Sequence, residues 1–585
     1  MAVRQSPDFA DNIEVAFKTL HDDIYRNSLV QRKQRQETEL HIVMMPYPLQ
    51  GHINPMMQFA KVLIDRYPVK VSFINIKHHH NRIRQALCTT SASSCADALH
   101  GSTSSLRNSY NPHKEEYFGG KLQLLSLEDG LPEGFNYADI LPGIHQLHVT
   151  SEKMREPLKE LLEKLHQRHS VACVVFGSFW PWIHSVSSDL RIPTFFFWTQ
   201  SAAVFSVYYH LPLLHANGFF PYNTEAKCIE GSENPKAAIS DNLEYIPGLP
   251  PLSISSTPTL FHVNSMDDPL LALIREQLEI LQNCDGLIIN TFEELERYAY
   301  RALREEVPCP VSLVGPLVPS ASLEEGFVNV VSVRSSLFSE STECLEWLNK
   351  HKKHSVLYIS FGSMCTPSVE DLQSIANGVK DSGRPFLWVL RPLSFTRTLA
   401  DMLPEGFIES TRDRGLIIPW APQLEVLAHP AVGGFLTHCG WNSTLEALSM
   451  GVPLVPFPIL SDQPTNCTFV CDVWKIGVPL RRNVQQKLES SDVDRAVRAV
   501  LGEEGELLRK RAMDLRESAT MAVRPSGSSS NHIEDFISNL RKCRDGVRPS
   551  GLSSNHIEDF MSNLRKSRDG VNQLSRIVPN AHITN

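Results

Sequence analysis

The sequence predicts an α/β protein made of two facing Rossmann-like domains with a cleft between them. Short apolar runs alternate with amphipathic segments over residues 40–306, and the same alternation returns over residues 341–522. A Pro-rich stretch between them, within 307–340, breaks the pattern and indicates an interdomain linker. The length of 585 residues also favours two domains or more.

In the first series, the predicted strand HIVMM begins at His41 and is followed by the Pro/Gly loop PYPLQGHI. We expect Asn54 to cap a helix that begins at Pro55. The helix would bury a stripe of apolar side chains: Met56, Phe59, Ala60 and Leu63. Later apolar runs predict further parallel strands: VKVSFIN, 171–176, 194–198 and 285–290.

The second series predicts another parallel sheet. Its apolar runs are SVLYISF (355–361), PFLWVL (385–390), GLIIPW (415–420), VGGFLT (432–437) and VPLVPF (452–457). Two βα series in succession place the carboxyl ends of both sheets at a shared cleft, where ligands bind in such folds.

The two ends of the chain lie outside these series. Residues 1–39 are polar and form a predicted disordered extension. Residues 523–546 (VRPSGSSSNHIEDFISNLRKCRDG) recur at 547–570 with three substitutions. We interpret 523–546 as a terminal helix and 547–585 as its tandem duplicate and tail, since two copies are too few for a stacked repeat.

Composition excludes several classes of protein. The net charge of -9 gives no electrostatic footprint for nucleic acid. The most hydrophobic stretch, 192–214, carries polar residues that indicate a buried strand and helix rather than a transmembrane segment. The start of the chain has no apolar core of signal-peptide type, and the twelve cysteines are scattered. We therefore expect a cytoplasmic protein. We also expect a monomer.

The densest pattern lies in residues 420–463. The strand VGGFLT ends at Thr437, the HCGW turn follows, and Asn442 and Ser443 open a helix. Free backbone N–H groups and the positive helix end at that point suit a diphosphate. The side chains of His438, Asn442 and Ser443 add hydrogen-bond donors to the same place.

Structural alternatives exist for single residues in this stretch. Trp420 offers a flat face on which a base can stack, but both Trp420 and Trp441 are also candidates for core aromatics. Ser443 and Glu446 form the S-x-x-E pattern of a helix capping box. Their convergence in 44 residues favours a nucleotide site over packing alone.

This stretch resembles the signature box of plant family 1 UDP-glycosyltransferases from its opening Trp to its closing Asp-Gln. Other segments match the family in order: HIVMMPYPLQGHINPMMQFA, IPGLPPL, DGLIINTFEELE, SVLYISFGS and LPEGF. The resemblance covers roughly residues 40–545. It implies a fold of GT-B type, UDP-glucose as co-substrate, no metal or other cofactor, and a small, lipophilic acceptor.

The resemblance also implies roles for single residues. The implied UDP-sugar site contains Trp420 stacked on uracil with Gln423 beside it, Ala421, Glu446 on the ribose, His438, Asn442, Ser443 and Ser363 on the phosphates, and Asp462 and Gln463 on the sugar. In this family, a closing Gln together with Trp441 goes with glucose as the donor sugar. The string Asp492-Val493-Asp494 is interpreted as acids at a helix start and not as a metal site.

His52 matches the catalytic base of the family. Its pKa, if near ~6.5, lets a neutral imidazole take a proton from an acceptor hydroxyl. The family places an orienting Asp after the strand that matches VACVVF, but this chain has Gly177 there, with Ser178 next to it as a weaker hydroxyl candidate. Two hypotheses therefore stand: an active glucosyltransferase, or a UDP-sugar- or acceptor-binding protein with weakened catalysis. A nucleotide-sugar epimerase is set aside because no early strand is followed by G-x-G-x-x-G.

Overall fold

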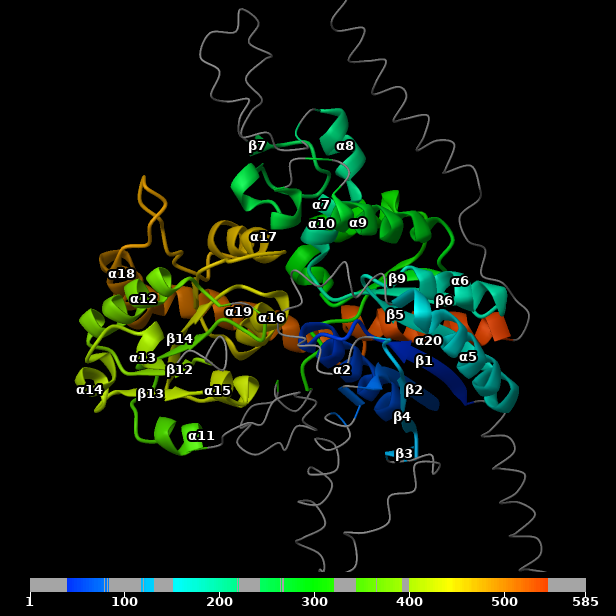
Figure 1. Ribbon diagram of the computed structural model, residues 1–585, viewed down its shortest axis with the longest axis horizontal. Coiled ribbons are helices and arrows are strands. Elements are labelled where there is room, and N and C mark those ends of the chain that lie inside the picture. Colours follow the sequence, from blue (N-terminus) through cyan, green and yellow to red (C-terminus); the bar gives the residue numbers. More distant parts are fainter. Residues whose placement is uncertain are drawn as a thin grey trace, which may run out of the picture.

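The computed structural model describes residues 39–77, 117–130, 151–217, 242–319, 343–391 and 399–544, apart from 119, 263–264, 266–267 and 365, with a few isolated positions between these ranges. The predicted extension before residue 39, part of the predicted linker and the predicted duplicate at 547–585 lie outside the described residues. Figure 1 shows two lobes side by side, with the strands β1, β2 and β4–β6 in one and β12–β14 in the other.

The first lobe is built on an eight-stranded sheet in the order β10-β9-β6-β5-β1-β2-β4-β3. Its strands are β1 (Leu40–Met45), β2 (Val69–Ile76), β3 (Tyr117–Phe118), β4 (Leu122–Leu127), β5 (Val171–Gly177), β6 (Thr194–Trp198), β9 (Gly286–Ile289) and β10 (Val311–Leu313). All neighbours pair in parallel except β3 with β4. The strand order reverses between β1 and β5, so ligands are expected beyond their carboxyl ends.

The second lobe holds a five-stranded parallel sheet in the order β13-β12-β11-β14-β15. Its strands are β11 (Val356–Ser360), β12 (Phe386–Val389), β13 (Gly415–Ile418), β14 (Val432–Thr437) and β15 (Leu454–Pro456). This order also reverses, between β11 and β14. The predicted fold of two Rossmann-like domains is confirmed, and the predicted strands agree with the observed ones to within two residues at each end.

Helices surround both sheets. In the first lobe they are α2 (Gln50–Arg66), α5 (Arg155–His169), α6 (Trp182–Asp189), α7 (Ala202–Tyr209), α8 (Leu211–Ala216), α9 (Pro269–Glu279) and α10 (Glu293–Glu306). In the second they are α11 (Glu343–Leu348), α12 (Val369–Ser382), α13 (Leu399–Met402), α14 (Phe407–Thr411), α15 (Gln423–Ala428), α16 (Trp441–Met450), α17 (Gln463–Thr468), α18 (Ser490–Leu501) and α19 (Glu504–Val523). Among the helices of the described ranges, none has the length and apolar character needed to span a bilayer.

The predicted start of helix α2 is wrong. The helix begins at Gln50, not at Pro55, and the cap position is Leu49, not Asn54. The reason is that the Leu49 carbonyl accepts the N–H groups of both His52 and Ile53, at 2.9 Å each, so the helix is already formed when the chain reaches Pro55. His52 consequently lies in the first turn of α2 and not in a loop.

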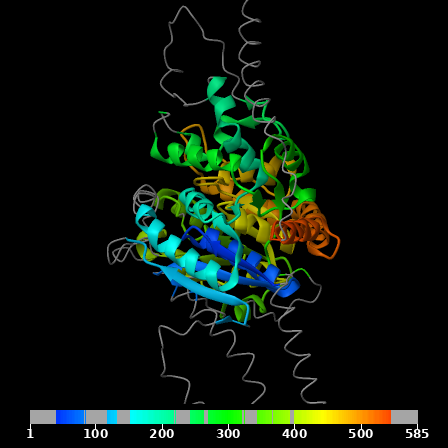
Figure 2. The same ribbon diagram turned by 90° about the vertical axis from the view of Figure 1, so that its right-hand side faces the viewer.

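The last described helix, α20 (Ser528–Arg544), returns from the second lobe to the first. Its buried residues Ile533 and Phe536 join the core that contains β1 and β2, and Phe536 packs edge-on against Phe195. The His532 ring accepts the Leu313 N–H at 3.1 Å at the edge strand β10. Figure 2 shows the orange and red C-terminal helices together at one side of the molecule. Strand β10 (Val311–Leu313) extends the first domain beyond the predicted limit at 306 and into the predicted linker. We propose that the other domain limits drawn from the sequence hold, with α20 completing the core of the first domain.

The duplicated sequence provides a matched test of this docking. Phe536→Ala removes a side chain that is only 3% exposed, and we expect it to lower the free energy of unfolding by about 3–5 kcal/mol. The corresponding residue of the second copy is Phe560. We expect Phe560→Ala to change stability by less than about 0.5 kcal/mol in urea unfolding. Equal losses in the two variants would mean that the second copy also packs on the protein.

Candidate functional site

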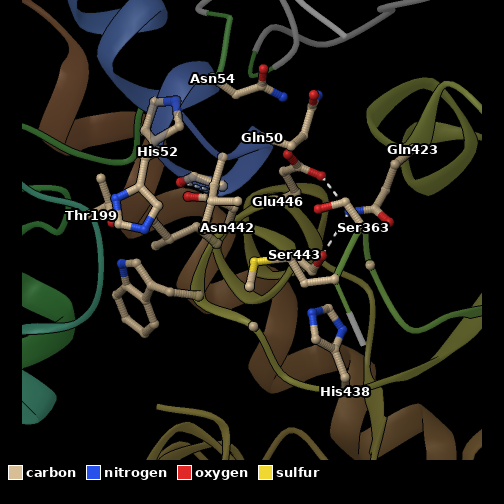
Figure 3. Close-up of a pocket in the computed structure, with 18 of the residues that line it drawn as sticks. Gln50, His52, Asn54, Thr199, Ser363, Gln423, His438, Asn442, Ser443 and Glu446 are labelled. Atoms are coloured by element: carbon tan, nitrogen blue, oxygen red, sulfur yellow. Dashed lines mark hydrogen bonds between the residues drawn. The ribbon is translucent and has the colours of Figure 1, made fainter. Parts of the chain in front are cut away.

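A cavity of about 340 Å³ lies between the carboxyl ends of the two sheets. The predicted donor-site residues all line it: Ser363, Trp420, Ala421, Gln423, His438, Trp441, Asn442, Ser443, Glu446, Asp462 and Gln463. His52 lines it from the first lobe, whereas Gly177 is not among its lining residues. The two lobes therefore contribute to one site, and Figure 3 shows the side chains converging on it.

Gln423 organises one end of the cavity. Its amide nitrogen donates to Ser443 Oγ at 2.9 Å and to Glu446 Oε2 at 2.7 Å, while its carbonyl oxygen accepts from Tyr358 Oη at 3.3 Å. Both bonds from the amide nitrogen are drawn in Figure 3. Because Ser443 accepts here, its own hydroxyl proton can be donated to a ligand.

The capping-box alternative for Ser443 and Glu446 is wrong. Helix α16 begins at Trp441 with Gly440 in the cap position. Ser443 is therefore inside the first turn and bonds to Gln423. The S-x-x-E spacing instead places both side chains near one another on the helix surface that faces the cavity.

The two tryptophans have different surroundings. Trp441 is 3% exposed, and its indole N–H donates to the Asn290 carbonyl of the first lobe at 2.7 Å. Trp420 lines the cavity, and the guanidinium of Arg391 lies 5.1 Å from its ring centre. Arg391 also donates to the Ser363 carbonyl at 2.7 Å, so one cation supports two parts of the cavity wall.

Two glycines make room for His438. A Cβ on Gly362, which has φ +76°, would lie 2.7 Å from the His438 ring, and one on Gly440 would lie 2.5 Å from Nε2. Burial lowers the pKa of His438 to about 4, so the ring is neutral at physiological pH. Thr437 Oγ1 accepts the Cys439 N–H and lies 3.4 Å from His438 Nδ1. When this hydroxyl donates to Nδ1, the ring proton lies on Nε2 and is available to a ligand.

Asp462 is a buried carboxylate. Asn466 Nδ2 donates to it at 2.6 Å and also donates to the Cys439 carbonyl at 3.0 Å. Burial raises its pKa to about 6, against the opposing effect of these and neighbouring hydrogen bonds. Gln463 is anchored separately, because its Oε1 accepts the N–H groups of Ile459 and Leu460 at 2.8 and 2.9 Å.

His52 lines the same cavity from the side of the first lobe. It is 8% exposed and lies among aromatic rings, with centroid distances of 5.5 Å to Tyr47 and 6.0 Å to Phe179. Burial lowers the pKa of His52 to about 4. The imidazole is therefore neutral, but it is a weaker base than the sequence alone suggested.

The hydrogen-bond partner of His52 is a hydroxyl. Nδ1 lies 3.3 Å from Thr199 Oγ1, which follows β6, and this partner is Thr199 rather than Ser178. A carboxylate only accepts, so it would hold the ring proton on Nδ1; a hydroxyl both donates and accepts and does not select one tautomer. At Gly177, an added Cβ would lie 2.9 Å from the Tyr47 nitrogen, so this backbone has no room for a side chain unless the chain near Tyr47 shifts.

Asp492 and Asp494 lie away from the cavity. They belong to the first turns of α18, where Arg495 and Arg498 pair with them at 2.7 and 2.6 Å. The cap position is Glu489. In the described part of the chain, no group of three or more His, Cys, Asp or Glu side chains is arranged to hold a metal ion.

Sequence reasoning missed Thr199 and Arg391. Each stands directly after a short apolar strand, TFFFW and FLWVL respectively. The rule that ligands gather at the carboxyl ends of parallel strands could have marked both. Asn290 was missed because its backbone carbonyl, not its side chain, receives Trp441.

The family model "UDP-glucoronosyl and UDP-glucosyl transferase" matches residues 335–520. The chain is 34% identical over 512 residues to UDP-glycosyltransferase 85A3 of Arabidopsis thaliana, covering 86% of this chain and 97% of that protein. It is 32% identical over 509 residues to a 7-deoxyloganetin glucosyltransferase of Gardenia jasminoides, covering 86% and 96%.

Two solved structures are also similar to this chain. Os79 from O. sativa in complex with UDP has a TM-score of 0.67 at 26% identity and covers 85% of this chain and 100% of its own. Phytolacca americana UGT2 complexed with UDP-2fluoro-glucose and pterostilbene has a TM-score of 0.64 at 26% identity, covering 86% and 100%.

The raised pKa of Asp462 predicts how its replacement changes stability. Its pKa rises from 3.8 to about 6 in the folded protein, so the folded state binds more protons between these values and stability falls as pH rises through them. Above this pH window the ionised Asp462 lowers the free energy of unfolding by up to about 3 kcal/mol, and below the window this loss vanishes. We therefore expect Asp462→Asn to be more stable than the parent at about pH 8 and not at about pH 4 in urea unfolding. The same difference at both pH values would contradict this origin of the shift.

Proposed function

The chain belongs to the plant family 1 UDP-glycosyltransferases, and on this premise we propose that it transfers glucose from UDP-glucose to a hydroxyl or carboxyl group of a small, largely apolar acceptor. The observation that carries the proposal is that one cavity is lined both by the whole predicted donor set and by His52. The glucosyltransferase from Gardenia jasminoides and the complex with UDP-2fluoro-glucose and pterostilbene support glucose as the sugar and an apolar acceptor.

In the proposed donor complex, uracil stacks on the cavity side of Trp420, whose ring is held by Arg391. Gln423 orients the Glu446 carboxylate toward the ribose hydroxyls. Ala421, between Trp420 and Gln423 in the sequence, is 4% exposed. The attraction between the Arg391 guanidinium and the ring helps to fix the orientation of Trp420.

The diphosphate is proposed to bind at the start of α16. Free N–H groups and the positive helix end attract it. The neutral His438 donates from Nε2, and Ser443 donates its hydroxyl proton, which its bond to Gln423 leaves available. Ser363, in the loop after β11, completes the phosphate contacts. Asp462, Gln463 and the buried Trp441 are the proposed sugar contacts and the reason for choosing glucose.

His52 is the proposed base. Its neutral imidazole takes the proton of the acceptor hydroxyl, the acceptor oxygen attacks the anomeric carbon, and the bond from that carbon to UDP breaks with inversion. The charge that grows on the leaving UDP meets the donors at the start of α16. With a pKa near 4 and a hydroxyl partner, His52 serves best for acceptors that lose their proton readily.

The second candidate is a UDP-sugar-binding protein with weakened catalysis. It is favoured by two observations. Position 177 is a glycine whose added Cβ would lie 2.9 Å from the Tyr47 nitrogen, and the partner of His52 is uncharged. This candidate shares the donor site with the enzyme and differs only in turnover.

We also propose that the protein acts in the cytoplasm. The described cysteines are all free thiols, which suits a reducing compartment. A monomeric state stays a prediction.

One set of variants separates the two candidates. UDP should raise the melting temperature of the parent, and Trp420→Ala or Glu446→Ala should remove that shift. His52→Ala should keep the UDP shift but form no glucoside from UDP-glucose and a panel of phenols, measured by mass spectrometry. Trp347→Ala is the matched control, because Trp347 does not line the cavity and its ring centre lies 4.0 Å from that of His351.

Each outcome tests a different part of the proposal. Glucoside formation by the parent and not by His52→Ala supports the enzyme. A UDP shift without any product in the parent supports the binding protein. A UDP shift that survives in both Trp420→Ala and Glu446→Ala would refute the assigned donor contacts.

A further inference from the structure

Pro55 leaves one carbonyl of helix α2 without its usual partner. In an α-helix the N–H of residue 55 would bond to the carbonyl of residue 51, but proline has no N–H. Pro55 is the sixth residue of α2, well inside the helix. The Gly51 carbonyl is therefore available to a donor from outside the helix.

The second lobe supplies that donor. Asn442 Nδ2 donates to the Gly51 oxygen at 2.8 Å. A Cβ on Gly51 would lie 3.7 Å from the same nitrogen, at ordinary van der Waals contact. Figure 3 shows Asn442 between His52 on one side and Gln423 with Glu446 on the other.

The accepting carbonyl is part of the peptide unit that contains the backbone nitrogen of His52. The N–H of this unit donates to Leu49 at 2.9 Å, and its C=O accepts from Asn442 at 2.8 Å. Both ends of the peptide are thus fixed, and the His52 side chain leaves the backbone at the next atom. Asn442 is also the second residue of α16, at the proposed diphosphate site.

We propose that Asn442 is a positioning residue that couples the diphosphate site to His52 through the Gly51 carbonyl that Pro55 leaves free. The Asn442 amide carries two protons; one is on Gly51, and the other is directed to the bound diphosphate. Ordering of the donor then orders the turn that carries the base. The catalytic part of this inference depends on the proposed function, whereas the coupling itself does not.

Other contacts hold the lobes together without Asn442. Trp441 donates to the Asn290 carbonyl at 2.7 Å, and Thr465 Oγ1 donates to the Ser256 carbonyl at 2.7 Å. Thr259 and Ser461 exchange two hydrogen bonds across the cleft, at 2.7 and 2.9 Å. Loss of the Asn442 bond should therefore loosen one turn of α2 and not separate the lobes.

A double-mutant cycle tests the coupling. Pro55→Ala returns an N–H to the helix that can hold the Gly51 carbonyl when Asn442 is removed, and alanine suits the helix. With saturating UDP-glucose, we expect Asn442→Ala to lower kcat by roughly fivefold in the parent, as for loss of one neutral hydrogen bond. In the Pro55→Ala background the same change should lower kcat less than about twofold. Pro269→Ala is the control, because that proline is the first residue of α9 and frees no carbonyl within the helix.

A second measurement does not depend on turnover. Hydrogen exchange of residues 49–54 in the full chain should slow when UDP binds to the parent, and should not slow in Asn442→Ala at saturating UDP. If the parent transfers no glucose but UDP still slows hydrogen exchange of residues 49–54, the proposed function would be overturned and the coupling would not.

The coupling would be overturned by equal fold-losses for Asn442→Ala in both backgrounds, or by unchanged UDP protection in Asn442→Ala. A weaker UDP affinity in Asn442→Ala, equal in both backgrounds and without any loss of kcat, would assign Asn442 to phosphate binding alone.

Discussion

The carboxyl ends of two parallel sheets meet across one cavity, and every proposed contact of this protein depends on that meeting. Each sheet reverses its strand order at the cavity, between β1 and β5 in the first lobe and between β11 and β14 in the second. Reversal sends the helices that follow adjacent strands to opposite faces and opens a crevice there. Helix α20 follows the second lobe in the chain and packs in the core of the first lobe. It therefore connects the two lobes.

Burial sets the chemistry of the site. It lowers the pKa of His52 and of His438 to about 4 and raises that of Asp462 to about 6. Both imidazoles are neutral at physiological pH. A neutral imidazole can donate a hydrogen bond or act as a base, and its partners decide which. His438 can present an N–H to an anion, whereas His52 can act as a base only in the tautomer that donates from Nδ1 to Thr199. These groups therefore support the proposed binding of the donor more strongly than the proposed activation of the acceptor.

Much of this could be predicted from the sequence, and the exceptions have physical reasons. The apolar runs located the strands because parallel strands buried on both faces are continuously hydrophobic. The pattern at 420–463 located one wall of the cavity because its residues follow one another along a strand, a turn and a helix. The start of α2 was misplaced because Pro55 usually marks the first turn of a helix, and here the Leu49 carbonyl had already formed it. The bond between His52 and Thr199 and the bond between Gly51 and Asn442 join residues 147 and 391 positions apart, so no local pattern could show that these residues pair.

The central claim is that His52, partnered by a hydroxyl instead of a carboxylate, transfers glucose from UDP-glucose to acceptors that give up their proton readily. The most direct test is the rate of glucoside formation by the parent protein across carboxylic acids, phenols and aliphatic alcohols of graded pKa, at saturating UDP-glucose. The account predicts that carboxylic acids and phenols react and that simple alcohols barely do, with rates that fall as acceptor pKa rises. Rates that do not depend on acceptor pKa would contradict it, because they would require a stronger base than His52 with Thr199 can provide.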